Sequence, residues 1–291
     1  MVFDEKNYVY HENQRAGGNG INAGIIAHNL GSQVMLTGFI GGSSGETIAK
    51  LLNQVTIDHK FIKIVGQTRI NITISNKADH RQTRLSFPGP IIQTSEKIKL
   101  HHFLKKLATN DIVLLGGSLP PGIDFAYLIL LIKEVKKRKA YCFVDMPGKF
   151  LKEIIYFKPD FIKPNLVEFQ SLVGKKVTTI KTVLPIAKKL LEYIPFICIS
   201  SIEGGALLVS KDKTWFGKIP RVKIHSTVGA GDSMVGAMAN LWNKKPHATG
   251  DELLRLGLAA SCATLTERGL TLGTKKSILN YQPQIILKEI K

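Results

Sequence analysis

The 291-residue sequence predicts an α/β fold, in which a mainly parallel central sheet is flanked by helices and a small β lid lies beside it. Two observations predict this fold. In the second half of the chain, short apolar runs alternate with helical patterns, as is typical of parallel sheets covered by helices. Between residues 57 and 87, apolar and polar residues instead alternate one by one, which predicts strands with one solvated face.

The core is predicted to begin with a helix over residues 17–31, a buried strand over Val34–Ile40 and a second helix around residues 45–54. Gly31 is the expected end of the first helix. The later strands are predicted at Asp111–Leu115, Tyr141–Val144, Phe161–Ile162 and Phe196–Ser200, followed by a hairpin of Ala206–Val209 and Lys218–Val222. The last third of the chain is expected to be helical.

The molecule is predicted to have two parts, and each part is formed by two separate stretches of chain. The lid is formed by residues 1–15 and 57–88, and the α/β core by residues 16–56 and 89–291. The alternating pattern is clearest in the segments Phe61–Val65 and Arg69–Ser75. A strand with one apolar and one polar face needs cover for its apolar face, so the lid is not expected to fold by itself.

The formal net charge of +18 creates a positive field that attracts anions. The lysines are dispersed along predicted helix faces, and no basic run is interleaved with aromatic residues as in nucleic-acid-binding proteins. The charge is interpreted as a solvated, lysine-rich surface or as an attraction for phosphorylated small molecules. No nucleic-acid partner is expected.

No apolar run approaches the roughly 20 residues that span a bilayer, and the first residues lack the apolar stretch of a signal peptide. The three cysteines are widely spaced and form no CxxC pair: Cys142, Cys198 and Cys262. Such a set indicates reduced, buried thiols rather than a metal–thiolate site. The sequence therefore predicts a cytoplasmic protein with no membrane partner.

The strongest chemical signal lies in residues 226–238, Ser-Thr-Val-Gly-Ala-Gly-Asp-Ser-Met-Val-Gly-Ala-Met. The Gly229-Ala230-Gly231 loop has little side-chain bulk, and the residues that follow it continue at helical spacing. Free amides at a helix N-terminus form an anion site. Asp232 would lie beside a bound phosphate and could accept a proton from an attacking hydroxyl group. A glycine turn capped by an aspartate explains the same pattern equally well.

A second glycine motif occupies residues 17–22, Gly-Gly-Asn-Gly-Ile-Asn. A dinucleotide fingerprint would have to follow an apolar strand, and here the polar segment Glu12–Arg15 precedes it. The motif could let a substrate lie against the backbone while the Asn22 amide binds hydroxyl groups. When this motif is considered by itself, a purely structural turn remains the simpler interpretation.

Together the two motifs resemble the two signatures of the PfkB family of carbohydrate kinases, which have a ribokinase-like fold. The resemblance covers nearly the whole chain and includes three further segments: Gly116–Gly122, Lys163–Glu168 and Gln67–Arg69. Residues 226–238 are similar to the form found in the minor-type 6-phosphofructokinases of this family. Fructose 1-phosphate and tagatose 6-phosphate kinases usually have lysine at the position of Asn19.

This resemblance implies ATP-dependent phosphorylation of a sugar phosphate, with conversion of fructose 6-phosphate to fructose 1,6-bisphosphate as the main expectation. Fructose 1-phosphate and tagatose 6-phosphate are the alternative substrates. A catalytically weak paralogue that binds sugar phosphate or nucleotide is a third interpretation. The resemblance also implies Mg²⁺ as a cofactor, K⁺ as a further candidate, and a homodimer formed through the lids.

The resemblance assigns roles to the matching residues. Catalysis is expected from Asp232 as the base, with the amides of Gly229, Ala230 and Gly231 stabilising the transferred phosphoryl group. The sugar and its phosphate are expected to contact Gly17, Gly18, Asn22, Arg69 and Ser118. The nucleotide is expected near Lys6, Lys163, Asn165, Ser200, Gly229 and Gly231. Glu168 is expected to hold Mg²⁺ through water.

Two features depart from the family pattern. Family members normally open with a core strand whose aspartate binds sugar hydroxyls, and Met1 falls after that strand. The first core strand is therefore expected to be missing, and a longer upstream reading frame is expected to supply it. Ile202 stands where relatives commonly have glycine, in a loop expected to face the nucleotide, and its branched side chain is expected to weaken ATP binding.

Overall fold

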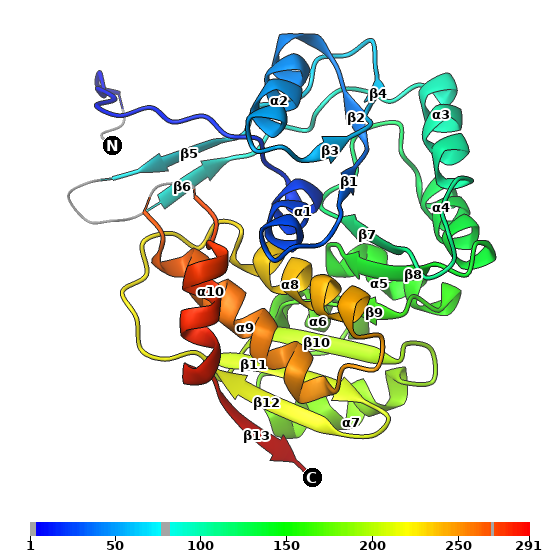
Figure 1. Cartoon of the computed structure of the whole chain (residues 1–291), viewed down its shortest axis with the longest axis vertical. Coiled ribbons are helices and arrows are strands. Elements are labelled where there is room, and N and C mark those ends of the chain that lie inside the picture. The colour runs from blue at the N-terminus through cyan, green and yellow to red at the C-terminus, as the bar shows by residue number, and fades with distance from the viewer. Residues whose placement is uncertain (1–3, 77–81, 269–270) are drawn as a thin grey trace.

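A seven-stranded sheet runs through the lower part of the molecule in the computed structural model, which describes residues 4–76, 82–268 and 271–291 (Figure 1). Four strands are parallel to one another: β7 (Ile112–Gly116), β8 (Tyr141–Asp145), β9 (Phe161–Ile162) and β10 (Phe196–Ile202). Three antiparallel strands extend the sheet beyond β10: β11 (Gly205–Ser210), β12 (Thr214–Lys218) and β13 (Ile286–Ile290). The predicted parallel core is confirmed, with an antiparallel extension.

Helices cover both faces of this sheet and bury two separate apolar clusters. One face packs against α3 (Thr94–Leu104), α4 (Phe125–Lys137), α5 (Gly148–Ile154), α6 (Leu166–Val173) and α7 (Ile180–Leu190). The other packs against α1 (Asn19–Asn29), α8 (Ala230–Lys244), α9 (Gly250–Thr266) and α10 (Lys275–Tyr281). Successive strand residues alternate between the two clusters: Cys142 and Val144 face the first, and Phe143 faces the second. Because both faces of the sheet are buried, the sequences of its strands are continuous apolar runs.

The part of the chain that precedes α3 forms three small two-stranded sheets. Two are parallel pairs of two-residue strands: β1 (Met35–Leu36) with β3 (Asp58–His59), and β2 (Phe39–Ile40) with β4 (Ile62–Lys63). The third is an antiparallel pair, β5 (Ile72–Ser75) with β6 (Gln82–Leu85), which projects to the left in Figure 1. Residues 1–3 and 77–81 of the predicted lid, and residues 269–270 of the predicted core, lie outside the described residues.

The helix and strand predictions for residues 17–54 are correct in type and differ in extent. The single strand predicted over Val34–Ile40 is divided into β1 and β2, because Gly38 has a φ of 142° that interrupts the extended backbone. The second predicted helix is α2 (Gly42–Gln54), which begins three residues earlier than expected.

Two predictions for the end of the chain are wrong. The second hairpin strand was placed at Lys218–Val222, whereas β12 is Thr214–Lys218. The tight turn from Ser210 to Lys213 starts this strand early, since the Ser210 amide donates to the Lys213 carbonyl at 3.2 Å. Pro220 has no amide hydrogen and cannot continue the ladder. The last third is also not wholly helical, because β13 closes the chain by pairing with β12.

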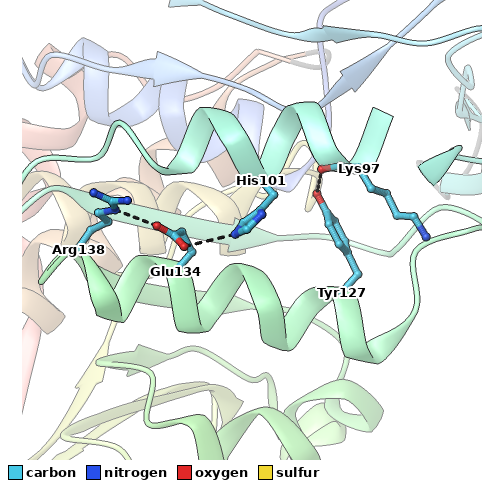
Figure 2. Close-up of polar contacts among 5 residues, drawn as sticks. All are labelled: Lys97, His101, Tyr127, Glu134 and Arg138. Atoms are coloured by element: carbon cyan, nitrogen blue, oxygen red, sulfur yellow. Dashed lines mark hydrogen bonds and ion pairs between the residues drawn. The ribbon is translucent and has the colours of Figure 1, made fainter. Parts of the chain in front are cut away.

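Polar contacts join α3 to α4 (Figure 2), and Lys97 Nζ also donates to the Gly122 carbonyl oxygen, in the loop before α4, at 3.1 Å. The buried Glu134 carboxylate accepts hydrogen bonds from Arg138 Nε at 2.8 Å and His101 Nε2 at 3.3 Å. The Tyr127 hydroxyl donates to the Lys97 carbonyl oxygen at 2.7 Å. Burial raises the pKa of Tyr127, so this hydroxyl keeps its proton and remains a donor.

The three cysteines are free and buried, as predicted. Burial raises the pKa of the Cys142 and Cys198 thiols to about 12, which makes both of them unreactive at neutral pH. Within the described part of the chain, every helix is too short or too polar to cross a membrane.

Helices α1 and α8 approach each other closely, and both begin at a glycine motif. A Cβ atom on Gly236 of α8 would lie 2.8 Å from the Ala23 Cα atom of α1 and would also overlap the Ala23 carbonyl oxygen. Farther along, Asn240 Nδ2 donates to the Ala27 carbonyl oxygen at 3.3 Å. This packing brings the N-terminal ends of two helices together, although they are separated by some two hundred residues of chain.

Replacing Gly236 with alanine is therefore expected to destabilise the fold. The added methyl group would force α1 away from α8, and overpacking of this kind costs roughly 1–3 kcal/mol, which outweighs the gain of up to about 1 kcal/mol in helix propensity. Urea denaturation measures the change. Asn243→Ala, at an exposed position of the same helix, is the control, because it changes helix propensity without adding a group to a packed contact. A Gly236→Ala variant as stable as the parent protein would contradict this view of the contact.

Candidate active site

The N-terminal end of α8 forms the centre of the candidate site. Gly229 precedes the helix with a φ of 82°, a conformation that favours glycine, and its carbonyl oxygen accepts from the Ser233 amide at 2.8 Å. The amides of Gly229, Ala230 and Gly231 belong to the turn and first helical residues, where helix geometry leaves amides without intrahelical partners. The predicted loop and the start of the helix are confirmed, and the arrangement suits an anion.

Asp232 lies in the first turn of α8 and is held by a residue from the other glycine motif. Asn22 Nδ2 donates to Asp232 Oδ2 at 2.6 Å. Burial raises the pKa of Asp232, and the hydrogen bond from Asn22 opposes that shift. A carboxylate with a raised pKa and a fixed orientation is suited to accept a proton from a hydroxyl group.

Asn22 is 4% exposed, and its Oδ1 atom is one of two buried side-chain polar atoms without a partner in the described residues. A buried acceptor without a donor costs free energy, which a hydroxyl group of a ligand could recover. The backbone at Gly17 and Gly18 adjoins open space, because Cβ atoms built there meet no atom within 4 Å. These observations favour a substrate site over a purely structural turn at the first glycine motif.

A buried ion pair lies on the other side of the α8 N-terminus. Lys163 Nζ lies 3.1 Å from Asp145 Oδ1, and both residues are at most 5% exposed. Burial disfavours the charged ammonium group, but Asp145 outweighs that effect and the pKa of Lys163 is raised. Lys163 Nζ also lies 3.2 Å from the position that a Cβ atom on Gly231 would occupy. A charged lysine therefore faces the predicted anion site.

Asn165 and Glu168 form the N-terminal cap of α6. Asn165 Oδ1 accepts from the Glu168 amide at 2.9 Å, and Glu168 Oε2 accepts from the Asn165 amide at 2.8 Å. Ser200 is joined to the same corner, because its amide donates to the Pro164 carbonyl oxygen at 3.0 Å. The structure thus brings Lys163, Asn165, Glu168 and Ser200 together beside the α8 N-terminus.

Glu168 is the residue that could hold a magnesium ion. Its Oε2 atom caps α6, so Oε1 remains available, and burial raises the pKa of this carboxyl group. No cluster of three or more His, Cys, Asp or Glu side chains suited to a metal occurs in residues 4–76, 82–268 and 271–291. A site with a single available carboxylate suits Mg²⁺, which usually keeps several waters and binds substrate phosphates. Such an ion would neutralise charge on the phosphates of a nucleotide.

Arg69 and Ser118 meet beside a cavity. Arg69 Nη2 donates to Ser118 Oγ at 2.9 Å, and Nη1 donates to the Phe87 carbonyl oxygen at 3.2 Å. The cavity has a volume of about 200 Å³ and is lined by Phe39, Ile64, Thr68, Arg69, Gly89, Pro90, Ile92, Ser118 and Pro120. The loop that carries Ser118 also reaches the first glycine motif, since a Cβ on Gly116 would lie 3.2 Å from the Asn19 Cβ.

Two predicted features are placed differently by the structure. Lys6 is exposed, and its Nζ atom lies 5.1 Å above the ring of Tyr8 rather than at the α8 N-terminus, because the segment before α1 runs outward (Figure 1). Ile202 was expected to face the nucleotide, but it is 0% exposed and packs in the first apolar cluster. The positive φ angles fall instead on Ser201 and Glu203.

Three residues of the site were missed by the sequence analysis. Asp145 ends a strand and pairs with Lys163, and the only sequence signal was its position after an apolar run. Arg84 of β6 donates from Nη2 to Thr227 Oγ1 at 2.8 Å and so links the lid to the second glycine motif. Arg15, which directly precedes the first motif, approaches Gly229. No local pattern marks an arginine whose partner lies far away in the chain.

The arrangement can bind an anion, a metal ion and a hydroxylated ligand close to one carboxylate. A positively charged surface attracts the anions, and the α8 amides with Lys163 receive them. Asp232 and Asn22 lie at the same point and can hold and deprotonate a hydroxyl group. This combination is the one that phosphoryl transfer requires.

Comparisons with known proteins agree with this chemistry. A family model described as pfkB family carbohydrate kinase matches residues 2–277. The 1-phosphofructokinase of Bacillus subtilis is 30% identical over 274 residues, which are 92% of this chain and 87% of that protein. A tagatose-6-phosphate kinase of Staphylococcus epidermidis is 31% identical over 257 residues, which are 87% of this chain and 82% of that protein.

Solved structures of phosphofructokinase-2 from Escherichia coli have a similar fold. The complex with potassium superposes with a TM-score of 0.91 and is 28% identical, covering 97% of this chain and 92% of that chain. The complex with fructose-6-phosphate has a TM-score of 0.86 and is 27% identical, covering 94% and 92%. These likenesses confirm the predicted ribokinase-like α/β fold.

Replacing Asp232 with asparagine is expected to stabilise the fold at neutral pH. Because the native pKa lies above the ordinary value of 3.8, ionisation of this group costs stability as the pH rises from that value through the native pKa. The neutral isostere removes this cost, so its advantage should be complete above the native pKa and shrink as the pH falls through that pKa toward 3.8. Urea denaturation across this range, with the exposed Asp212→Asn as control, measures the difference. An advantage that grows toward acidic pH would contradict the assigned shift.

Proposed function

Because the chain belongs to the pfkB family of carbohydrate kinases, we propose that it transfers the γ-phosphoryl group of ATP to a hydroxyl group of a sugar phosphate. The observation that carries the proposal is the contact between Asn22 and Asp232, which joins the substrate motif to the candidate base at 2.6 Å. The proposed site of action is the cytoplasm.

In the proposed reaction, a sugar hydroxyl oxygen attacks the γ-phosphorus atom and forms the new P–O bond. The bond from this phosphorus to the β,γ-bridging oxygen breaks, and ADP leaves with the bonding electron pair. The hydroxyl proton passes to the Asp232 carboxylate. The amides of Gly229, Ala230 and Gly231 stabilise the negative charge on the transferred group.

Fructose 6-phosphate is the proposed substrate. Arg69 and Ser118 provide a guanidinium and a hydroxyl group at the cavity, and this pair suits the phosphate that the sugar already carries. Phosphofructokinase-2 from Escherichia coli, solved with fructose-6-phosphate, supports this choice. Fructose 1-phosphate and tagatose 6-phosphate are the alternatives, because curated relatives at 30% and 31% identity are named for them.

Mg²⁺ and K⁺ are the proposed cations. Glu168 would bind the magnesium ion through water, and Lys163, Asn165 and Ser200 would lie beside the nucleotide phosphates. The proposal for K⁺ is supported by a potassium complex of phosphofructokinase-2.

A coupled assay of ADP release over a panel of sugars and sugar phosphates tests the proposed function. We expect the highest kcat/KM with fructose 6-phosphate, and loss of turnover by about 10²–10⁴-fold in Asp232→Asn, which removes the proton acceptor. Faster turnover of fructose 1-phosphate or tagatose 6-phosphate would change the substrate. Binding of sugar phosphate and ATP, seen as a thermal shift without ADP release, would identify a binding protein instead.

The variant Arg69→Ala tests the phosphate clamp. Charge-assisted hydrogen bonds contribute about 1.5–3 kcal/mol, so KM for the sugar phosphate should rise by roughly 10–150-fold while KM for ATP changes little. Arg221→Gln, which removes a guanidinium group from an exposed position in the loop after β12, is the matched control. Preference for an unphosphorylated sugar over all sugar phosphates would contradict the clamp.

The lid, predicted over residues 1–15 and 57–88, is proposed to join two copies of the chain. It exposes apolar side chains that a second lid could cover: Val65, Ile70, Ile72, Leu85 and Phe87, which are 83%, 52%, 45%, 42% and 47% exposed. Ile72 and Leu85 are cross-strand partners and lie on one face of the β5–β6 pair. A tetrameric form of phosphofructokinase-2 also supports assembly.

Light scattering with substrate present is expected to give the mass of a dimer at micromolar concentration. The double variant Ile72→Asp, Leu85→Asp should be monomeric, because desolvating the added charges at an interface is costly. Ile286→Asp on β13, also an exposed apolar position, is the control and should remain dimeric. A parent chain that is monomeric under these conditions would refute assembly through the lid.

A further inference from the structure

We propose that Arg15 is a further catalytic residue, which binds the transferred phosphoryl group beside Gly229, at the turn that begins α8. This inference rests on the proposed function, because it concerns a residue of the same site. Arg15 belongs to the extended segment before α1 and is half-buried, although most of its neighbours in residues 4–14 are exposed.

The position of the guanidinium group is the first argument. Arg15 Nη2 lies 3.6 Å from the position that a Cβ atom on Gly229 would occupy, and Asn22 Nδ2 lies at the same distance from that point. The Leu272 Cδ2 atom lies 2.7 Å from that point, so an apolar side chain packs against Gly229 beside the guanidinium group and the Asn22 amide. A phosphoryl oxygen bound next to the Gly229 backbone, on the side away from Leu272, would have donors of both Arg15 and Asn22 within reach.

Electrostatics provide the second argument. The N-terminus of a helix carries a partial positive charge of about half an elementary charge, so a guanidinium group placed there is repelled unless an anion lies between them. Within the part of the chain that the structure describes, the Arg15 side chain makes no hydrogen bond and no ion pair. Asp232 attracts it without forming a direct pair, and burial lowers the pKa of Arg15. An arginine keeps its charge even so.

The contrast with Lys163 is the third argument. Both cations face the turn that begins α8, Lys163 near Gly231 and Arg15 near Gly229. The charge of Lys163 is already compensated by Asp145 at 3.1 Å. Arg15 has no such partner among the described residues, so its charge is the one that an incoming phosphoryl group would compensate. Two hydrogen bonds from one planar guanidinium group can also hold two phosphoryl oxygens, which a lysine cannot do.

The chemistry of the transfer makes this position effective. As the bond to ADP breaks and the bond to the sugar oxygen forms, negative charge is spread over the three equatorial oxygens of the phosphoryl group. A donor that contacts these oxygens stabilises the transition state more than the bound substrates, so its removal lowers kcat rather than raising KM. Removing one such donor typically costs about 10²–10³-fold in kcat.

The test compares Arg15→Met, Arg15→Lys and Arg15→Ala with the parent enzyme. We expect Arg15→Met to lower kcat by about 10²–10³-fold while the KM values for ATP and the sugar phosphate change far less. Arg15→Lys should recover part of the loss because it keeps the charge. Added guanidinium ion should restore turnover to Arg15→Ala but not to Asp232→Asn, a result that a structural role would not give. Arg221→Gln, at an exposed position in the loop after β12, should behave like the parent enzyme.

A binding measurement keeps the inference separate from the proposed function. ADP with Mg²⁺ and aluminium fluoride imitates the transferred phosphoryl group, and it should raise the melting temperature of the parent chain more than ADP with Mg²⁺ alone. Arg15→Met should lose this additional rise and keep the rise caused by ADP. A parent chain without turnover on any sugar phosphate would refute the proposed function, whereas this shift would still test Arg15.

Three outcomes would overturn the role of Arg15. The first is an unchanged kcat in Arg15→Met. The second is an increase in KM for the sugar phosphate at constant kcat, which would mean that Arg15 binds the substrate's own phosphate. The third is an equal thermal response of Arg15→Met and the parent chain to aluminium fluoride with ADP.

Discussion

The close contact between α1 and α8 is the constraint on which the site depends. Each helix begins at a glycine motif, and each motif contributes one residue to the proposed chemistry: Asn22 from the first and Asp232 from the second. Their 2.6 Å hydrogen bond exists only because Gly236 lets the two helices approach. The central sheet also keeps the two helices together, because α1 and α8 pack on one of its faces and share one apolar cluster. The rest of the fold thus holds two helix N-termini at a fixed separation.

Charges around this contact are arranged in an asymmetric way. Asp145 and Lys163 form a buried ion pair, so the charges of these two side chains compensate each other. Asp232, the Asn22 Oδ1 atom and Arg15 are each less than fully satisfied. Buried polar groups that lack hydrogen-bond or charge partners reduce stability. They tend to occur at sites where a bound ligand supplies the missing partners. All three converge on the N-terminus of α8, so the destabilised part of the molecule coincides with the proposed place of reaction.

Much of the fold and part of the site could be predicted from the sequence, because their signals are local. Apolar runs marked β7 to β10, and the glycine motifs marked the beginnings of α1 and α8. Arg69 and Ser118 were expected to bind one phosphate, and they do contact each other. The boundary of β12 was missed because it depends on a tight turn and on pairing with β13, the last strand of the chain. Asp145, Arg84 and Arg15 were missed because their partners lie far away in sequence.

The lid contacts both the proposed sugar-phosphate site and the second glycine motif. Arg84 of β6 reaches Thr227, only two residues before Gly229, while Arg69 on the same segment reaches Ser118. Hydrogen bonds therefore join this part of the lid to both ends of the proposed site, where the sugar phosphate binds and where the phosphoryl group is transferred. Hydrogen bonds between exposed side chains such as these contribute modestly, about 1 kcal/mol each, so they can break and reform without unfolding the core. A segment with weak contacts to both ends can admit substrates and still order the site once they are bound, because ligands add the contacts that the free protein lacks.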